Sequence, residues 1–118
     1  MVDAEGDILY QLMRVIEGRK RDLPPSSYTT RLFEGGMAKI AEKILEEAGE
    51  VVAAAGEDPD SRHDHVVHEA ADVLYHLWVL LAHCDVQLSE VEAELGRRFG
   101  VSGLDEKAAR GQNEEPSE

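Results

Sequence analysis

The sequence predicts an all-α protein, a helical bundle of about five helices. Apolar residues recur every three or four positions over long segments, which is the spacing of an amphipathic helix. No segment gives a convincing strand. The length of 118 residues and the hydrophobic content of 42% are typical of one folded domain. We expect this domain to span residues 1–110, and we expect the acidic tail, residues 111–118, to be disordered.

The first two helices are separated by a proline pair. The first is expected over residues 5–21, where the apolar positions are Ile8, Leu9, Leu12, Val15 and Ile16. Pro24 and Pro25 end this helix, because the residue before a proline is biased away from helical geometry. A short second helix is expected over residues 26–33, with Ser26 and Ser27 as capping residues. The pair Gly35-Gly36 then breaks the chain.

Three further helices are expected after this glycine pair. The third covers residues 37–55 and stops at Gly56. Residues 56–64 are polar and contain Pro59, so they are expected to form a loop. The fourth helix covers residues 65–83. The fifth begins near Ser89, where Ser89 and Glu92 match a capping box, and it ends before Gly100.

The fourth helix is apolar on most of its sides. Its apolar residues are Val66, Val67, Ala70, Ala71, Val73, Leu74, Leu77, Trp78, Val79, Leu80 and Leu81. A helix that is apolar nearly all round is normally buried in a larger core. A single chain of this size rarely buries a helix so fully, so we expect a homo-oligomer.

Carboxylates occur at matching intervals on the third and fourth helices. Glu47 and Glu50 lie one turn apart, with Glu46 beside Glu50, and Glu69 and Asp72 have the same spacing. Unpaired charges within an apolar helix are costly, and a cation would compensate for them. Carboxylate oxygens favour Mg²⁺ or Mn²⁺ over zinc. The alternatives are a solvated acidic face, with Lys43 and Glu47 as a surface ion pair, and pairing of the fourth-helix acids with basic residues.

Charge and cysteine content exclude several classes of protein. The formal net charge of −13 argues against a nucleic-acid or anionic-membrane surface, since both need a basic face. One cysteine, Cys84, excludes an internal disulfide framework and favours a reducing, cytoplasmic setting, and we expect its side chain to be buried. No apolar run is long enough for a membrane span, and the acidic N-terminus shows no signal peptide.

The acid pattern resembles the metal signature of the all-α nucleoside triphosphate pyrophosphatases, the MazG-like superfamily. That pattern is Glu46-Glu47-x-x-Glu50, eighteen residues, then Glu69-x-x-Asp72. Within the superfamily the chain is similar to the phosphoribosyl-ATP pyrophosphatase family over about residues 7–110. The segments that carry this similarity are Arg19-Lys20, Ser26-Ser27-Tyr28-Thr29, Leu32-Phe33, Gly36, Lys39-Ile40-Ala41-Glu42-Lys43, Glu69 to Leu77, and Ser102 to Lys107.

The resemblance implies the second step of histidine biosynthesis, hydrolysis of phosphoribosyl-ATP to phosphoribosyl-AMP and pyrophosphate. It implies Mg²⁺-assisted attack of water at the α–β phosphate linkage, and it favours a dimer. The family's metal positions correspond to Glu47, Glu50, Glu69 and Asp72. Glu46 matches the first acid of the signature, and it and Glu47 are the catalytic candidates.

Basic and hydroxyl residues are candidates for binding the polyphosphate. These candidates are Arg19, Ser27, Tyr28, Lys39 and Lys43, with Lys20 and Thr29 beside them. For the serine and its neighbours, helix capping is an equal alternative. His63, His65 and His68 are expected to form a polar loop cluster rather than a metal site. His76 either orients Asp72 or is a hydrogen-bonded core histidine.

Two other functions are consistent with the same residues. One is a different MazG-like pyrophosphatase that cleaves dCTP, dUTP or damaged nucleotides. The other is an acidic helical interaction protein without catalysis, which would need no divalent ion and would tolerate Asp72→Asn.

Overall fold

A computed structural model of the chain describes residues 7–100, and every regular element within them is helical. There are four helices: α1 (Ile8–Asp22), α2 (Tyr28–Ala55), α3 (Pro59–His83) and α4 (Leu88–Phe99). Two compact units divide after Asp85, so that α1 to α3 belong to the first and α4 to the second. The all-α prediction is therefore confirmed for the described residues. The expected tail, residues 111–118, and the segment Ser102–Lys107 lie outside them.

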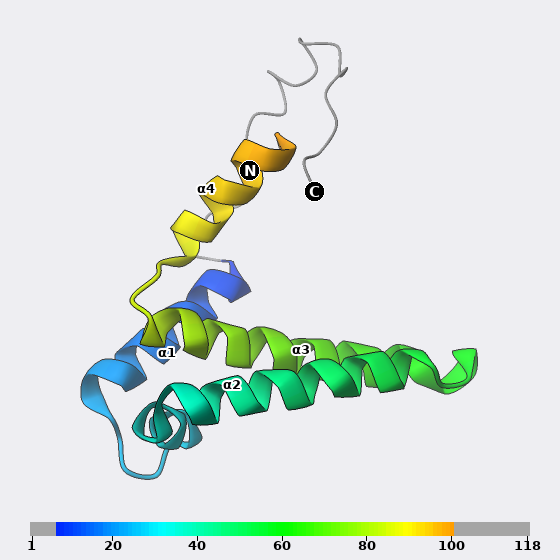
Figure 1. The fold of residues 1–118 in the computed structure, drawn as a ribbon, viewed down its shortest axis with the longest axis horizontal. Coiled ribbons are helices and arrows are strands. Elements are labelled where there is room, and N and C mark those ends of the chain that lie inside the picture. Colours follow the sequence, from blue (N-terminus) through cyan, green and yellow to red (C-terminus); the bar gives the residue numbers. More distant parts are fainter. Residues whose placement is uncertain (1–6, 101–118) are drawn as a thin grey trace. The chain divides into compact units, whose positions relative to one another are not determined.

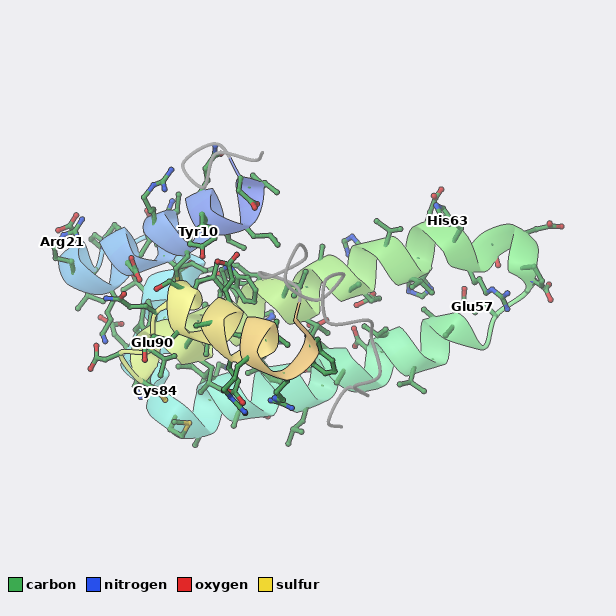
Figure 2. The ribbon with its side chains drawn as sticks, turned by 90° about the horizontal axis from the view of Figure 1, so that it is seen from above. Tyr10, Arg21, Glu57, His63, Cys84 and Glu90 are labelled. Atoms are coloured by element: carbon green, nitrogen blue, oxygen red, sulfur yellow. The ribbon has the colours of Figure 1, made fainter. Side chains whose placement is uncertain are left out.

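The first unit is built on a long antiparallel hairpin. In Figure 1, α2 and α3 lie side by side along most of their length, and α1 packs against both near the open end of the hairpin. Figure 2 shows Glu57 at the turn that joins the two long helices. Because residues on facing turns of α2 and α3 are adjacent in space, acids from both helices can meet.

The core lies where α1 crosses this hairpin. Its buried apolar side chains are Met13 and Ile16 of α1, Leu32 and Ile40 of α2, and Trp78, Val79 and Ala82 of α3, whereas the buried Ala54 lies beside the turn of the hairpin. The Trp78 indole N–H donates a hydrogen bond of 2.8 Å to the Leu9 carbonyl oxygen, so the buried ring also satisfies its polar atom. Burying a side chain such as Ile16 completely contributes about 1.5–3 kcal/mol.

Local signals explain the ends of α1. The Asp7 carboxylate caps the helix by accepting the Leu9 N–H at 2.9 Å. The predicted start at residue 5 lies outside the described residues, and Asp7 itself has extended backbone geometry. At the other end, Leu23 adopts a left-handed conformation with φ 50°, and the proline pair follows directly.

The predicted second and third helices are two parts of α2. The break expected at the glycine pair is present as a kink at Gly36, which has φ 78° and ψ −170°. A non-glycine residue would be strained at that positive φ. The helix count is therefore four rather than five, because α2 includes the helical residues on both sides of the kink.

Two helix starts differ from the prediction. α3 begins at Pro59 rather than at residue 65, since Asp58 provides the N-cap and proline is well suited to the first helical position. The expected loop therefore shrinks to residues 56–58. α4 begins at Leu88, and the Glu90 carboxylate accepts the Gln87 N–H at 3.1 Å, so the box predicted from Ser89 lies two residues too late.

The lone cysteine is also placed differently from the prediction. Cys84 caps the C-terminus of α3 and is exposed, whereas a buried side chain was expected. Its position after the last turn of the helix takes it out of the α2–α3 contact. Among the described residues, no helix is both long and apolar enough to cross a membrane.

Candidate active site

Carboxylates from α2 and α3 gather in the first unit. One oxygen each of Glu47, Glu50 and Glu69 lies within 4.8 Å of the others. Asp72 follows Glu69 by one helical turn. These two acids and His68 form a second group, whose ligand atoms also lie within 4.8 Å of one another. The two antiparallel helices thus bring together the four acids that were predicted as metal ligands.

Two of these acids each bury one carboxylate oxygen that has no hydrogen-bond partner in the described part of the chain. Glu47 and Glu69 each keep only 8% of their surface exposed. One carboxylate oxygen of each, Oε1, is buried and has no hydrogen-bond partner among the described residues. Buried charged oxygens in this state cost about 1–3 kcal/mol or more, so the site calls for a positive partner.

The raised pKa of Glu47 also indicates that the cluster needs a positive partner. Burial is the main cause that raises the pKa of the Glu47 carboxyl, and the charges of Glu50, Asp72 and Glu69 raise this pKa further. Like charges this close oppose one another's ionisation. The donor set consists of several hard oxygens, which is what Mg²⁺ prefers and Mn²⁺ accepts. The residues present therefore fit a divalent cation.

Lys43 lies on α2 beside the cluster and is paired mainly with Glu46. Its Nζ donates to Glu46 Oε1 at 3.1 Å and lies 4.0 Å from Glu47 Oε2. The hydrogen bond to Glu46 is the leading cause that raises the pKa of Lys43. Glu46 is exposed and is not part of either group of converging ligand atoms. Its place is next to the cluster rather than inside it.

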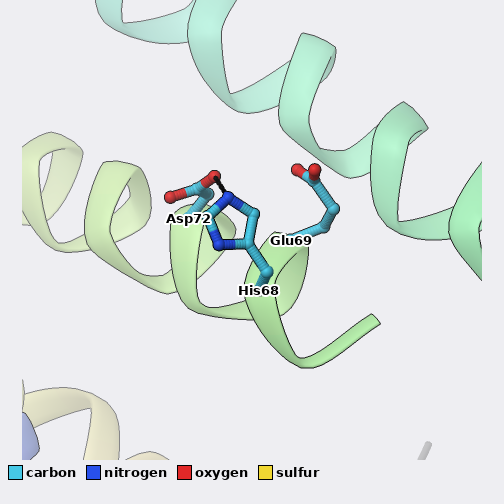
Figure 3. A group of neighbouring side chains, drawn as sticks. All are labelled: His68, Glu69 and Asp72. Carbon is cyan, nitrogen blue, oxygen red and sulfur yellow. Dashed lines mark ion pairs between the residues drawn. The ribbon is translucent and has the colours of Figure 1, made fainter. Parts of the chain in front are cut away.

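Two histidines contact the acids of α3. His65 Nε2 lies 3.3 Å from Glu69 Oε2, and its Nδ1 lies 2.8 Å from Glu57 Oε2. The hydrogen bond to Glu57 is the main reason that the pKa of His65 is raised. His68 Nε2 lies 3.5 Å from Asp72 Oδ2, and the dashed line in Figure 3 marks this ion pair. The expected polar loop cluster is therefore a set of helical side chains, because α3 starts at Pro59.

His76 is a hydrogen-bonded core histidine. It is 4% exposed, and its Nδ1 lies 2.8 Å from the backbone oxygen of Asp72. A carbonyl only accepts, so Nδ1 donates, and in the neutral ring Nε2 is left to accept from the Tyr28 hydroxyl at 3.0 Å. His76 thus contacts the backbone of Asp72 rather than its carboxylate. Burial is the main cause that raises the pKa of Tyr28.

The remaining predicted binding residues divide between the connection before α2 and the surface. Arg19 Nη1 donates to Ser27 Oγ at 3.1 Å, and the same oxygen accepts the Thr30 N–H at 3.3 Å as the cap of α2. Lys39 is exposed and its side chain lies over Gly35, where an added Cβ would meet Lys39 Cβ at 2.8 Å. Arg19, Ser27, Tyr28 and His76 form a continuous line of contacts and sequence neighbours that reaches Asp72.

Lys20, which stands next to these candidates, makes structural contacts in the first unit. Its Nζ donates to the Ala82 carbonyl oxygen and to Asp85 Oδ1, both at 2.7 Å. These bonds tie the end of α1 to the end of α3. Thr29 is buried, and its hydroxyl forms a hydrogen bond with that of Tyr75.

The contacts of His65 and His68 were missed by sequence reasoning. Each histidine precedes its acid by four residues, which is the spacing of side chains that touch on one helix face. That signal was available within the predicted helix 65–83, but His65 and His68 were grouped with His63 as a polar loop cluster instead. Pairing of Glu57 with His65 across the hairpin turn has no comparable sequence signal.

Comparison with known proteins places this chain in a family. Residues 9–99 match the family model described as phosphoribosyl-ATP pyrophosphohydrolase. A protein of Nitrosospira multiformis named phosphoribosyl-ATP pyrophosphatase is 50% identical over 91% of this chain and 86% of its own length. A protein of that name from Rhodobacter capsulatus is 52% identical over 87% of this chain and 97% of its own length. Another, from Hydrogenovibrio crunogenus, is 40% identical over 92% of this chain and 96% of its own length. With the match covering most of α1 and all of α2, α3 and α4, the chain belongs to the phosphoribosyl-ATP pyrophosphohydrolase family.

Proposed function

We propose that this chain hydrolyses phosphoribosyl-ATP to phosphoribosyl-AMP and pyrophosphate, the second step of histidine biosynthesis. The proposal rests on family membership and on the name that its relatives carry. The single structural observation that supports it is the acid cluster, in which Glu47 and Glu69 bury unpartnered carboxylate oxygens between α2 and α3. A cluster of this kind suits a substrate that arrives as a complex of metal and polyphosphate.

The cation would be held by Glu47, Glu50, Glu69 and Asp72. Mg²⁺, or Mn²⁺ in its place, supplies charge neutralisation on the phosphate oxygens and orientation of the attacking water when it is bound. The burial of Glu47 and Glu69 fixes two of these ligands between the packed helices. The long α2–α3 hairpin therefore holds its acids in place without help from a loop.

Glu46 and Glu47 are the proposed catalytic residues. Glu46 is exposed at the edge of the cluster, and the hydrogen bond from Lys43 at 3.1 Å holds its carboxylate in place. We infer that Glu46 accepts a proton from the water that attacks the α–β linkage. Glu47 has a different role, since its buried carboxylate faces the other acids and holds the cation.

The negative charge of the substrate requires cationic partners in this acidic chain. We propose Lys39, Lys43 and Arg19 for the phosphates, and the hydroxyls of Ser27 and Tyr28 for phosphate or ribose. Ser27 Oγ accepts hydrogen bonds from Arg19 and from the Thr30 N–H, so its own proton remains available for donation. Lys39 is exposed on α2 one turn before Lys43, within reach of an extended polyphosphate.

We further propose that the protein is a homo-oligomer, most simply a dimer. Large apolar side chains are exposed on both arms of the hairpin: Leu45 is 74% exposed, Val52 73% and Val67 56%. Leu45 and Val52 are seven residues apart and so share one face of α2. A second copy would remove this apolar stripe from water. A cytoplasmic setting, without nucleic-acid or membrane partners, stays a prediction.

The test is pyrophosphate release with and without Mg²⁺ from phosphoribosyl-ATP, beside ATP, dCTP and dUTP. We expect Mg²⁺-dependent release from phosphoribosyl-ATP alone. Glu50→Gln and Asp72→Asn should abolish turnover while circular dichroism remains that of the folded bundle. Asp64→Asn, an exposed acid of the same helix, is the matched control and should retain activity. A preference for a deoxynucleotide, or turnover that survives Asp72→Asn, would refute the proposal.

A further inference from the structure

Two imidazole rings stand at the acid cluster, although an all-oxygen magnesium site needs none. His65, His68, Glu69 and Asp72 occupy one face of α3, since each histidine precedes its acid by one helical turn. Figure 3 shows the His68 ring turned toward Asp72, while Glu69 of the same turn points toward α2. The ligand atoms of His68, Glu69 and Asp72 all lie within 4.8 Å of one another.

The contact of His68 is longer than a good hydrogen bond. Its Nε2 lies 3.5 Å from Asp72 Oδ2, whereas such bonds are usually about 2.7–3.2 Å long. Two ligands of one tetrahedral ion, each about 2.1 Å from the metal, are separated by roughly 3.4 Å.

His65 lies outside this group of ligand atoms and is held between two carboxylates. Its Nδ1 is held by the Glu57 carboxylate at 2.8 Å, which leaves Nε2 facing Glu69. A residue that contacts a metal-binding carboxylate from outside orients that ligand. Independently of these rings, the buried Oε1 of Glu69 has no hydrogen-bond partner among the described residues, so one oxygen of the cluster lacks a positive partner.

We infer that His68 adds a nitrogen ligand to Glu69 and Asp72, while His65 holds Glu69 in position, so that this chain binds a transition-metal ion of the zinc or cobalt class at this end of its acid cluster. This inference rests on the proposed function, because the cluster must be a metal site for His68 to change its preference. Imidazole favours such ions over Mg²⁺, whereas carboxylate oxygens alone suit Mg²⁺. His68 therefore alters which metal the site prefers.

The test compares the dissociation constants of Co²⁺ and Mg²⁺ by calorimetry, with the visible absorption of bound Co²⁺ as a second readout. His68→Asn should weaken Co²⁺ binding by about tenfold or more and shift the Co²⁺ spectrum, because a nitrogen ligand is lost. His65→Asn should weaken Co²⁺ binding by less, because His65 only positions Glu69. The affinity for Mg²⁺ should change by less than about threefold in both variants, so the ratio of the two constants falls.

His63→Asn is the matched control. His63 is an exposed histidine of α3, labelled in Figure 2, and five residues of helix place it about 140° around the axis from His68. Neither constant should change in this variant. If His68→Asn weakens Co²⁺ and Mg²⁺ binding equally, or leaves Co²⁺ binding unchanged, the inference is wrong and the rings only balance negative charge.

A fourth variant separates this inference from the proposed function. Glu47→Gln should remove Mg²⁺ binding if the cluster is the metal site of the pyrophosphatase. Loss of Mg²⁺ binding in Glu47→Gln, together with an unchanged metal preference in His68→Asn, would overturn only the histidine inference. Unchanged Mg²⁺ binding in Glu47→Gln would overturn the metal site itself and both proposals with it.

Discussion

Glu47 on α2 and Glu69 on α3 each bury a carboxylate oxygen at the same helix contact, and neither oxygen has a hydrogen-bond partner among the described residues. Burial and the neighbouring acids Glu69, Glu50 and Asp72 raise the pKa of Glu47. The metal-free fold therefore carries an electrostatic cost at its candidate site. Such a cost is expected where stability is given up so that ligands are already in position.

Replacement of Glu47 should make the metal-free protein more stable. Glu47→Gln removes a buried charge, and its amide can donate a hydrogen bond to Glu69. We expect the free energy of unfolding in EDTA at pH 7 to rise by about 1 kcal/mol, measured by urea denaturation. Glu42→Gln, at an exposed acid of the same helix, should change it by less than about 0.5 kcal/mol. A large loss of stability in Glu47→Gln would show that its charge is already compensated.

The raised pKa of Glu47 predicts how the stability of the metal-free protein depends on pH. The pKa of the Glu47 carboxyl is raised above its ordinary value of 4.5 in the folded state, so the unfolded chain loses this proton first. Protonated Glu47 therefore contributes its full share to the free energy of unfolding below pH 4.5. This contribution is lost as the pH rises through the higher pKa of the folded state. In EDTA, the urea concentration at the unfolding midpoint should fall with rising pH above 4.5, and it should fall more steeply for the unmodified protein than for Glu47→Gln. Parallel curves would contradict the prediction.

Divalent metal should reverse this cost. A cation that binds only the folded state at one hundred times its dissociation constant stabilises the protein by about 2.7 kcal/mol. We therefore expect Mg²⁺ to raise Tm and EDTA to restore the lower value, as followed by circular dichroism at 222 nm. Asp72→Asn should reduce the increase, and Asp64→Asn should retain it. An equal increase in both variants would indicate ionic strength rather than site binding.

Much of the site could be predicted from sequence because it depends on helical periodicity. Glu47 and Glu50, like Glu69 and Asp72, are fixed on one face by a spacing of three residues. The contact between α2 and α3 then brings these acids together. The break at Gly36 was also visible, since glycine is the residue that tolerates a positive φ.

Sequence reasoning failed where tertiary contacts or cap geometry decide the outcome. Pro59 was interpreted as part of a loop, although proline at the first position starts a helix equally well. That error placed His63 in a loop, whereas His65 and His68 already lay within the predicted helix and only their spacing to the acids was overlooked. Lys20 could not be separated from the phosphate-binding candidates, because its partners Ala82 and Asp85 are more than sixty residues away along the chain.

Lys20 should stabilise the fold without binding substrate. Its Nζ contacts Ala82 and Asp85 at 2.7 Å, and a charged hydrogen bond of this kind contributes about 1.5–3 kcal/mol where it is sheltered and less where it is exposed. We expect Lys20→Met to lower the free energy of unfolding by about 1 kcal/mol and to leave KM for phosphoribosyl-ATP unchanged. Arg21→Met is the control, since Arg21 is exposed and the ion pair between its Nε and Asp22 Oδ1 is long, at 3.8 Å. A higher KM with unchanged stability would return Lys20 to the substrate site.

The exposed stripe on α2 should control the oligomeric state. Leu45 and Val52 share one helix face and remain more than 70% exposed in a single chain, which is a large apolar area to leave in water. Leu45→Glu and Val52→Glu would place charges inside a packed interface, where an unpaired charge is strongly unfavourable. We expect each substitution to shift the protein toward monomer in sedimentation velocity, and the double variant to do so completely.

Arg62→Glu is the control for that shift. It makes a larger change of charge than either variant, at an exposed position of α3 about 140° around the helix from the apolar Val67. Its oligomeric state should equal that of the unmodified protein. Monomer formation by Arg62→Glu alone would point to net charge as the cause, because the chain already carries a formal charge of −13 and added acids increase its self-repulsion. Dimers that survive the double variant would show that another surface joins the chains and that the stripe on α2 has a different partner.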